Sequence, residues 1–280
     1  MPELPEVESI KIQLVKFLKN HTILKVEVHN TKYNITGRDV VGNKITDVRR
    51  FGKALVIDLS NDYSIVAHVK MTGQFIYKGP NLRTKPVYTK KVVGGVPGKH
   101  THVIFTLDRG GTLYFNDYRR FGWMELVQKS KVNSQNFIKK LGHEFLKDLG
   151  LAEFSEILSK TKKPIKVLLM DQTKMAGVGN IYANDALWMA KINPQRKADS
   201  LGKKEQTALF NAIESVLKEG IKRGGASELA FVTPDGGEGE YQDFTLVYGR
   251  DGEPCKTCKT QIKKIKLGGR GTYFCSKCQR

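Results

Sequence analysis

The first eight residues combine a proline with closely spaced acids, in the order Met-Pro-Glu-Leu-Pro-Glu-Val-Glu. Methionine is usually removed when a small residue follows it, and Pro2 would then carry a free secondary amine. An α-amino group has a pKa of about 8, so part of it is unprotonated and nucleophilic at neutral pH. Its attack on a carbon at the aldehyde level gives an iminium ion, a strong electron sink. Glu3, Glu6 and Glu8 are close enough in sequence to move protons for it.

The same residues also fit a purely structural role. Proline favours the first turn of a helix, and acids suit its positive end. The apolar residues that follow recur at helical spacing: Val7, Ile10, Leu14, Phe17 and Leu18. This spacing predicts an amphipathic helix over residues 4–19. On these residues alone, a helix start and a reactive N-terminus are both consistent with the sequence.

All four cysteines lie near the end of the chain, as Cys255-x-x-Cys258 and Cys275-x-x-Cys278. Two such pairs on a β-hairpin bring four thiolates within reach of one tetrahedral zinc ion. Disulfides and an iron–sulfur cluster are the alternatives for this spacing. Because the protein would fill all four ligand positions, we expect one structural Zn²⁺ per chain and no open position for catalysis.

The charge of the chain indicates a polyanionic partner. Lys and Arg number 47 against 28 Asp and Glu, a formal net charge of +19 spread along the sequence. Nucleic acid is the simplest such partner, and a basic protein without one is the alternative. No apolar run approaches the roughly 18 residues of a membrane span, and no signal peptide is recognisable. We expect a monomer in the cytoplasm, associated with the nucleoid, with no membrane partner.

Two segments of the first half carry residues that suit an opened DNA duplex. His68 to Gly73 ends a strand in a turn with Met71 at its tip, and Asn116 to Gly122 follows another strand. An exposed Met71, Arg119 and Phe121 could wedge between base pairs and fill the gap left by an extruded nucleotide. Each of them alone is more often a packing residue.

Four further residues are candidates for phosphate contacts, and three of them lie beside glycines. Asn180 follows Gly177-Val178-Gly179 and is a good N-cap for the next helix, where backbone N–H groups form an anion site. Lys166, in the preceding helix, could add positive charge. Arg270 lies at the expected turn of the cysteine-bearing hairpin, and Lys53 starts a strand. An ordinary helical hairpin and solvated charges are the structural alternatives.

The remaining pattern divides the chain into β-rich and helical parts. Short strands are expected in the first half, at residues 23–28, 54–59, 65–69, 103–107, 112–115 and 124–127. They indicate a β-sandwich or barrel, interrupted by a long loop over 79–100. Helices are expected later, at residues 154–158, 165–170, 181–190 and 209–221, before a mobile loop over 226–243. We expect domains at 1–130, 131–243 and 244–280.

Together these motifs resemble the bacterial formamidopyrimidine-DNA glycosylases, which repair oxidised purines. The likeness runs nearly end to end and rests on several motifs in the same order: residues 2–8, Lys53, 68–73, 116–122, Lys166, 176–182, 247–254 and 269–278. It implies an α+β multidomain protein. An N-terminal β-sandwich with an N-terminal helix would precede a helix–two-turn–helix domain and a β-hairpin zinc finger, with double-stranded DNA between the domains.

The resemblance also implies roles for individual residues. Pro2 would attack C1′ of the damaged nucleotide, Glu3 would assist proton transfer and ring opening, and Glu6 would hold the N-terminus and the everted base. Lys53 would belong to the catalytic residues and, with His68, Asn180 and Arg270, would hold phosphates of damaged or abasic DNA. Lys166 and Tyr182 would also contact DNA, and the void would be filled by Met71, Arg119 and Phe121. Base excision would proceed through a Schiff base, followed by β- and δ-elimination.

Two departures from the family pattern limit what the resemblance implies. Residues 224–233 differ from the Thr/Ser-rich sequence that is commoner in the base-capping loop of the family. Tyr118 stands where the family usually has a proline. An endonuclease VIII-like enzyme for oxidised pyrimidines is one alternative, although Leu4 argues against it because those chains typically begin Pro-Glu-Gly. A non-catalytic zinc-finger protein that binds DNA is the other, and it leaves Pro2 and its acids unexplained.

Overall fold

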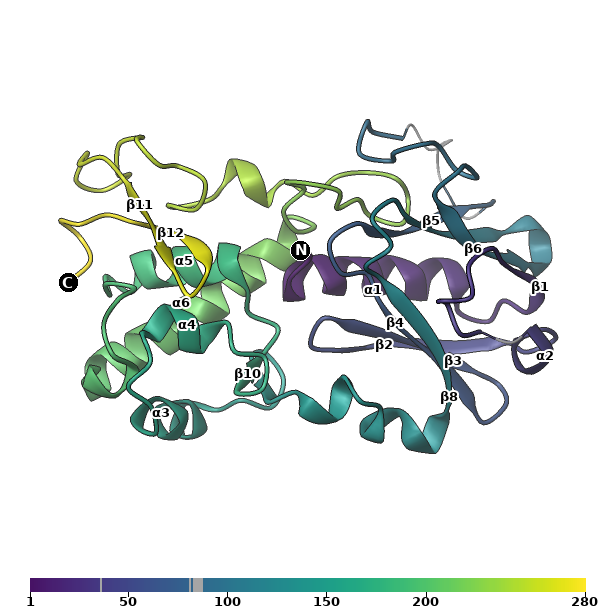
Figure 1. Ribbon diagram of the computed structural model, residues 1–280, viewed down its shortest axis with the longest axis horizontal. Helices are drawn as coiled ribbons and strands as arrows, with labels where there is room; N and C mark the ends of the chain where they lie inside the picture. The colour runs from purple at the N-terminus through teal and green to yellow at the C-terminus, as the bar shows by residue number, and fades with distance from the viewer. Residues whose placement is uncertain (36, 81, 83–87) are drawn as a thin grey trace. The chain divides into compact units, whose positions relative to one another are not determined.

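The computed structural model describes residues 1–35, 37–80, 82 and 88–280 of the chain. They form two compact units (Figure 1). One joins Met1–Lys139 to Ile221–Gln242, and the other joins Lys140–Gly220 to Asp243–Arg280. The three domains expected from the sequence, with their two boundaries, stay predictions. The structure adds that residues 221–242, expected in the helical part, pack with the N-terminal residues.

The first unit opens with helix α1 (Leu4–Leu18), as the apolar spacing predicts. Glu3 occupies the N-cap position and Glu6 the third helical position, in a capping-box arrangement. Pro5 lies in the first turn, where its missing N–H costs no hydrogen bond. The apolar face of α1 is buried, and the ring of Phe17 stacks on that of Tyr77 with 4.7 Å between centroids.

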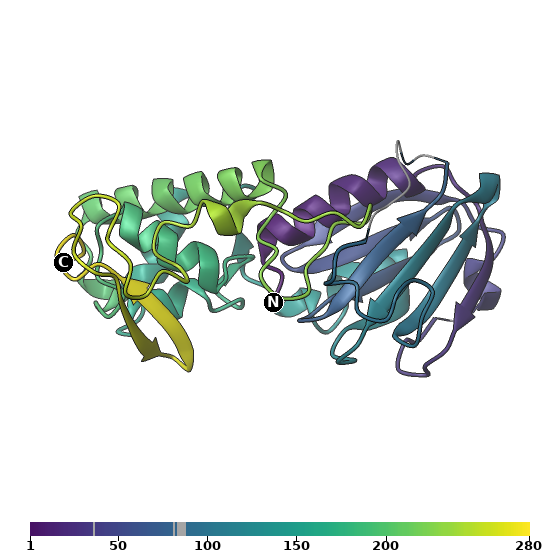
Figure 2. The ribbon, with the colours of Figure 1, turned by 90° about the horizontal axis from the view of Figure 1, so that it is seen from above.

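Two antiparallel sheets follow (Figure 2). The first sheet contains four strands, which pair in the order β1 (Ile23–Val28), β6 (Thr101–Leu107), β7 (Thr112–Asp117) and β5 (Gly73–Lys78). The second sheet also contains four, paired in the order β2 (Ile45–Phe51), β3 (Ala54–Leu59), β4 (Tyr63–His68) and β8 (Trp123–Gln128). A single apolar core includes α1 and both sheets, which confirms the predicted β-sandwich.

Shorter elements connect the strands. Helix α2 (Gly37–Val40) precedes β2, and a 3-10 helix, Lys129–Ser134, follows β8. The long loop predicted over 79–100 falls partly on residues 81 and 83–87, which lie outside the described residues. Its described part from Tyr88 onward forms turns, with neither helix nor strand up to His100.

The second unit contains the predicted helices. They are α3 (Leu151–Ser159), α4 (Ile165–Leu169), α5 (Asn180–Met189) and α6 (Lys203–Lys222), of which α6 continues into the first unit. A short parallel pair, β9 (His143–Glu144) and β10 (Met175–Ala176), precedes α5. Rings of Phe145, Phe154 and Phe210 pack with centroids 5.4 to 5.7 Å apart and form part of the apolar interior.

The last residues form the expected hairpin. Strands β11 (Lys263–Leu267) and β12 (Arg270–Phe274) pair around Gly268 and Gly269, whose φ angles are +56° and +75°. Such left-handed angles suit glycine, because it has no Cβ. Among the helices of the described residues, none has both the length and the apolar composition of a membrane span.

Candidate active site

Pro2 and the two acids that follow it are buried at the start of α1. Met1 is 47% exposed, whereas Glu3 and Glu6 are 3% and 1% exposed. The backbone N–H of Glu3 donates a hydrogen bond of 2.6 Å to Oε2 of Glu6. The side chain of Glu6 therefore fixes the backbone directly behind Pro2.

The second carboxylate oxygen of Glu6 binds a distant part of the chain. Oε1 accepts a hydrogen bond of 2.7 Å from the backbone N–H of Ala226. Gly225, just before it, has a φ of +88°, and a Cβ there would lie 2.8 Å from Cγ of Glu6. Glycine is thus required at this close approach. In the sequence, Gly224-Gly225 follows the last predicted helix and indicates the end of that helix, but not a contact with Glu6.

Lys53 and His68 are brought together at one end of the second sheet. Lys53 lies in the turn just before β3 and is 3% exposed, and His68 ends β4 and is 2% exposed. Nδ1 of His68 accepts the N–H of Lys70 at 2.9 Å. Burial, together with the positive charges of Lys70 and Lys53, lowers the pKa of His68 to about 3. The neutral ring therefore carries its proton on Nε2, where it can donate a hydrogen bond.

Met71, Arg119 and Phe121 form one cluster at the tips of two turns. The Arg119 guanidinium carbon lies 4.6 Å from the centroid of the Phe121 ring, and its Nη1 lies 3.7 Å from Sδ of Met71. Phe121 is 47% exposed and Met71 is half-buried. The structure thus assembles the three residues that the sequence singled out from two separate segments.

Asp117 joins these two turns. Its buried carboxylate accepts hydrogen bonds from the Thr72 hydroxyl and, at 2.6 Å, from the backbone N–H of Gly122. The Thr72 hydroxyl oxygen in turn accepts the N–H of Arg119 at 3.3 Å. Sequence reasoning assigned no role to Asp117 or Thr72. Both residues stand next to the candidate wedge residues in the sequence. This position could have indicated their role, because turns are often held by hydrogen bonds from nearby polar side chains.

The glycine turn of the second unit is held by Gln172. Its Oε1 accepts the N–H of Gly177 at 3.0 Å, and its Nε2 donates to the carbonyl of Val178 at 2.7 Å. Asn180 is half-buried and is the first residue of α5, whereas Gly179 occupies the N-cap position. The prediction that Asn180 caps the helix is therefore wrong by one residue. Its backbone N–H still belongs to the first helical turn.

Two predicted DNA-contacting residues are buried within the second unit. Lys166 is 0% exposed, and its ammonium group donates to the carbonyl of Gly271 at 3.4 Å. The Tyr182 ring is also buried and fits against Gly220, where a Cβ would lie 2.5 Å from the ring. A direct phosphate contact by either side chain stays a prediction, and the contacts in the structure are internal.

Arg270 is exposed at the start of β12, beside the turn of the hairpin. The hairpin is held by buried polar groups of helices α4 and α5. Oδ1 of Asn184 accepts the N–H of Tyr273 at 2.8 Å, and Lys166 binds the carbonyl next to Arg270. Asn184 was missed by sequence reasoning, because no local pattern shows which strand it contacts.

The four cysteines form a metal site of the predicted kind. Their Sγ atoms all lie within 4.8 Å of one another, with 3.4 Å between Cys258 and Cys275 and 3.9 Å between Cys255 and Cys278. Tetrahedral Zn–S bonds of about 2.3 Å place sulfur atoms about 3.8 Å apart. The cluster thus suits one zinc ion. Hydrogen bonds from Thr260 lower the pKa of Cys258 to about 6, whereas the hydrogen bond with Cys258 raises the pKa of Cys278.

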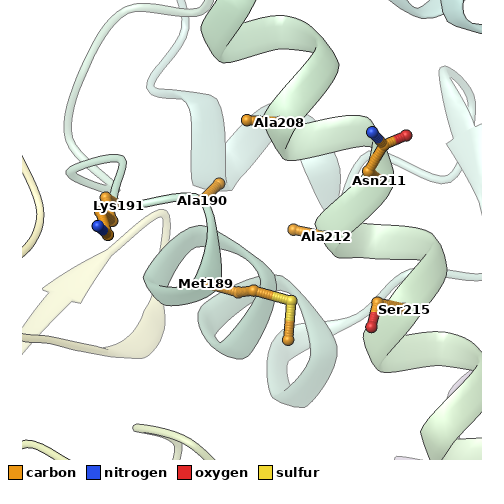
Figure 3. A pocket seen from close by; sticks show the side chains of 7 residues that line it. All are labelled: Met189, Ala190, Lys191, Ala208, Asn211, Ala212 and Ser215. Atoms are coloured by element: carbon orange, nitrogen blue, oxygen red, sulfur yellow. The ribbon is translucent and has the colours of Figure 1, made fainter. Parts of the chain in front are cut away.

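A separate cavity of about 510 Å³ lies between the end of α5 and α6 (Figure 3). Small and apolar side chains form most of its wall, which comprises Met189, Ala190, Lys191, Ala208, Asn211, Ala212 and Ser215. None of the residues predicted to act on DNA lines it. The predicted DNA-contacting residues are therefore not placed at this cavity.

Three family models match the chain. They are the formamidopyrimidine-DNA glycosylase N-terminal domain over residues 1–124, the formamidopyrimidine-DNA glycosylase H2TH domain over 141–231, and a zinc finger found in FPG and IleRS over 252–280. Together with the fold and the cysteine cluster, they define a DNA glycosylase with a helix–two-turn–helix domain and a zinc finger.

Relatives of known name extend this likeness over the full chain. The formamidopyrimidine-DNA glycosylases of Listeria innocua and Pelotomaculum thermopropionicum are 40% and 39% identical to it. Each alignment covers 100% of this chain, with 100% of the first relative and 99% of the second. The chain belongs to the formamidopyrimidine-DNA glycosylase family, which confirms the resemblance inferred from its motifs.

Solved structures show the same architecture. Lactococcus lactis Fpg (MutM), in a complex with DNA that contains N7-benzyl-Fapy-dG, is 32% identical with a TM-score of 0.86, and the match covers 100% of both chains. MutM (Fpg) of Thermus thermophilus is 34% identical with a TM-score of 0.86, over 99% of this chain and 98% of that one. The predicted α+β fold and zinc finger are thereby confirmed.

Proposed function

We propose that this enzyme removes oxidised purines, including 8-oxoguanine and formamidopyrimidines, from double-stranded DNA and then cleaves the abasic site. One observation carries the proposal. Glu6 lies buried behind Pro2 and binds the backbone N–H groups of both Glu3 and Ala226. A buried carboxylate that accepts two backbone hydrogen bonds is a fixed anchor for an N-terminal reagent. A helix start that served structure alone has no need of the second anchor.

The chemistry begins after removal of Met1, which frees the secondary amine of Pro2. The amine attacks C1′ of the damaged nucleotide, the C1′–N bond to the base breaks, and the base leaves with a proton. The sugar opens to an iminium ion, with Glu3 moving the proton. Because the iminium makes the C2′ proton acidic, β-elimination of the 3′ phosphate and δ-elimination of the 5′ phosphate follow, and water releases the sugar from Pro2.

The other site residues are proposed to hold the DNA in this reaction. Phosphate oxygens bind cations and N–H groups. Lys53 and Arg270 supply cations, and neutral His68 supplies the N–H of its Nε2. Asn180 supplies an N–H group at the start of α5. Met71, Arg119 and Phe121 are proposed to fill the space left in the stack, where their exposed cluster supplies both apolar surface and hydrogen-bond donors.

A panel of lesion duplexes tests the substrate class. The Lactococcus relative has been solved with DNA containing a substituted Fapy-dG and with DNA containing an oxidised pyrimidine, so both classes belong in the panel. We expect 8-oxoguanine and Fapy-guanine opposite cytosine to be excised at least about tenfold faster than thymine glycol under single-turnover conditions. Faster excision of the pyrimidine would favour the endonuclease VIII-like alternative, and no excision at all would favour a DNA-binding protein without this activity.

Three further expectations accompany this proposal. We infer that the protein lies in the cytoplasm, near the nucleoid, because its +19 charge favours DNA as its partner. We also infer that it works as a monomer. We also infer functional domains at 1–130, 131–243 and 244–280, with one structural zinc ion in the last of them. Sedimentation of the purified protein at several concentrations tests the oligomeric state.

A further inference from the structure

Residues 226–240 connect the candidate site to the β-sandwich without forming a helix or strand of their own. Of the residues from Gly225 to Pro234, only Glu228 and Leu229 are exposed. The carbonyl of Pro234 accepts the N–H of Tyr77 on β5 at 2.7 Å, and Asp235 exchanges two hydrogen bonds with Gln13 on α1. Figure 1 shows the segment beside β5. The sequence predicted a mobile loop here, whereas the structure anchors it.

Lys91 forms the charged anchor of this segment. Its ammonium group donates to the carbonyl of Ser227 and pairs with the carboxylate of Glu238. The two side chains are 25% and 31% exposed, so the pair is partly shielded from water. Hydrogen bonds with an ionised partner are roughly twice as strong as neutral ones. One lysine thus ties together both ends of the segment.

Gln74 of β5 also holds this segment against the sheet. Its Nε2 donates to the carbonyl of Ala230 at 2.6 Å and to the backbone carbonyl of Lys91 at 2.9 Å. Ser227 Oγ accepts the N–H of Gly239 at 2.9 Å. The carbonyls on both sides of the exposed pair, at residues 227 and 230, are therefore held by side chains that belong to the sandwich and its adjoining loop.

These contacts lead directly to Glu6. Ser227, which Lys91 holds, follows Ala226, whose N–H binds Oε1 of Glu6. The other oxygen of Glu6 binds the N–H of Glu3, next to Pro2. Ordering each residue costs backbone entropy, so a segment without regular structure stays ordered only where such anchors offset that cost. Loss of Lys91 would remove the only one of these contacts that joins the Ser227 carbonyl to a charged group, while the hydrogen bonds of Ser227 with Gln242 and Gly239 stay in place.

We propose that Lys91 is a positioning residue: it holds residues 226–240 against the β-sandwich before DNA binds, and thereby fixes the Ala226 N–H that orients Glu6. The proposal deepens the proposed function and rests on the role given there to Glu6. Lys91 itself touches neither Pro2 nor Glu6 through any contact described above. Its effect on the reaction is carried by the backbone between Ser227 and Ala226.

The test compares Lys91→Met with Lys90→Met, which removes an equal charge from the exposed neighbouring residue. Hydrogen exchange of residues 226–240 is measured in DNA-free protein, and base excision from an 8-oxoguanine duplex is measured in single turnover. We expect at least tenfold lower protection and about tenfold slower excision in Lys91→Met alone. Lesion-duplex affinity should match that of Lys90→Met, and Lys91→Arg should restore both readouts.

Two results would overturn the inference: unchanged protection of residues 226–240 in Lys91→Met, or equal behaviour of the Lys90 and Lys91 variants. If Lys91→Met does not fold, Lys91→Gln removes the charge while keeping a polar side chain, and it carries the same expectations with the same overturning results. Hydrogen exchange without DNA tests the anchor even if wild-type protein shows no excision. Absence of wild-type excision would refute the proposed function separately.

Discussion

Arg119 can do more than fill space in the cluster at the two turns. Its guanidinium lies over the Phe121 ring and beside Met71, so its position is set by apolar neighbours. It carries five N–H donors, which Met71 and Phe121 lack. The three side chains therefore share a surface but differ in chemistry, and substitutions should separate their roles.

We predict that Arg119→Ala loses discrimination among opposite bases, because the donors that can bind the orphaned base are gone. Met71→Ala and Phe121→Ala should slow excision of 8-oxoguanine about tenfold, since eversion costs a few kcal/mol that the wedge offsets. Single-turnover rates on duplexes with each opposite base measure both effects. An abasic duplex needs no base extrusion and should be cleaved nearly normally. Equal losses on abasic and 8-oxoguanine duplexes would show general damage to folding.

His68 gives a prediction about pH. Burial lowers its pKa to about 3 in the folded protein, whereas an unfolded histidine has a pKa of about 6.5. Between these values the unfolded state binds a proton that the folded state does not, so stability falls as pH decreases. Urea unfolding of wild type should lose up to about 1.4 kcal/mol per pH unit more than His68→Gln does. His29→Gln, at an exposed site, is the control, and identical slopes for all three proteins would refute the assignment.

At the scale of elements, buried and half-buried polar side chains determine where the functional turns lie. Asp117 fixes the two turns of the wedge, Gln172 fixes the glycine turn, and Lys166 with Asn184 fixes the zinc-finger hairpin. Lys166 has two candidate roles, a direct contact with DNA and support of the hairpin that carries Arg270. It was predicted to contact DNA, but it is buried and binds the hairpin carbonyl of Gly271, so a substitution can separate the two roles.

Lys166→Met should lower the stability of the second unit by about 1–3 kcal/mol, the usual cost of losing a buried hydrogen bond to a charged group. Affinity for DNA should fall several-fold, because the hairpin is less well held. The slope of log K against log salt should stay as in wild type, since no phosphate contact is lost. Lys162→Met, at an exposed site shortly before α4, serves as the control. A slope reduced by about one unit would instead show a direct phosphate contact.

The local patterns predicted most elements but not their long-range partners. The N-terminal helix, six strands, four helices and the cysteine hairpin all follow from periodicity and spacing. Strand β2 was missed because Asp47, Arg49 and Arg50 interrupt its apolar pattern, and β5 because it begins at a glycine within a predicted turn. The contact between Glu6 and Ala226 joins residues 220 positions apart, so no local pattern could show it.

At the scale of the whole molecule, the +19 charge makes a prediction about affinity. Each phosphate that the protein neutralises releases counterions, which contributes a slope of roughly −0.9 in log K against log salt. Lys53 and Arg270 are the charged candidates for such contacts, whereas neutral His68 and the Asn180 turn would add hydrogen bonds without releasing counterions. We therefore expect a slope of about −2 or steeper, measured by fluorescence anisotropy with an abasic duplex between roughly 50 and 200 mM salt. A slope near zero would contradict the interpretation of the charge.

The central claim is that Pro2 is the nucleophile, and covalent trapping tests it most directly. Protein shown by mass spectrometry to lack Met1 is incubated with an 8-oxoguanine duplex and borohydride, which reduces an iminium ion to a stable amine. The account predicts one DNA adduct per chain, mapped to Pro2, and none with protein that retains Met1. Pro2→Gly should still bind lesion DNA while losing most base release. An adduct at another residue, or full turnover by protein with Met1 uniformly attached, would contradict it.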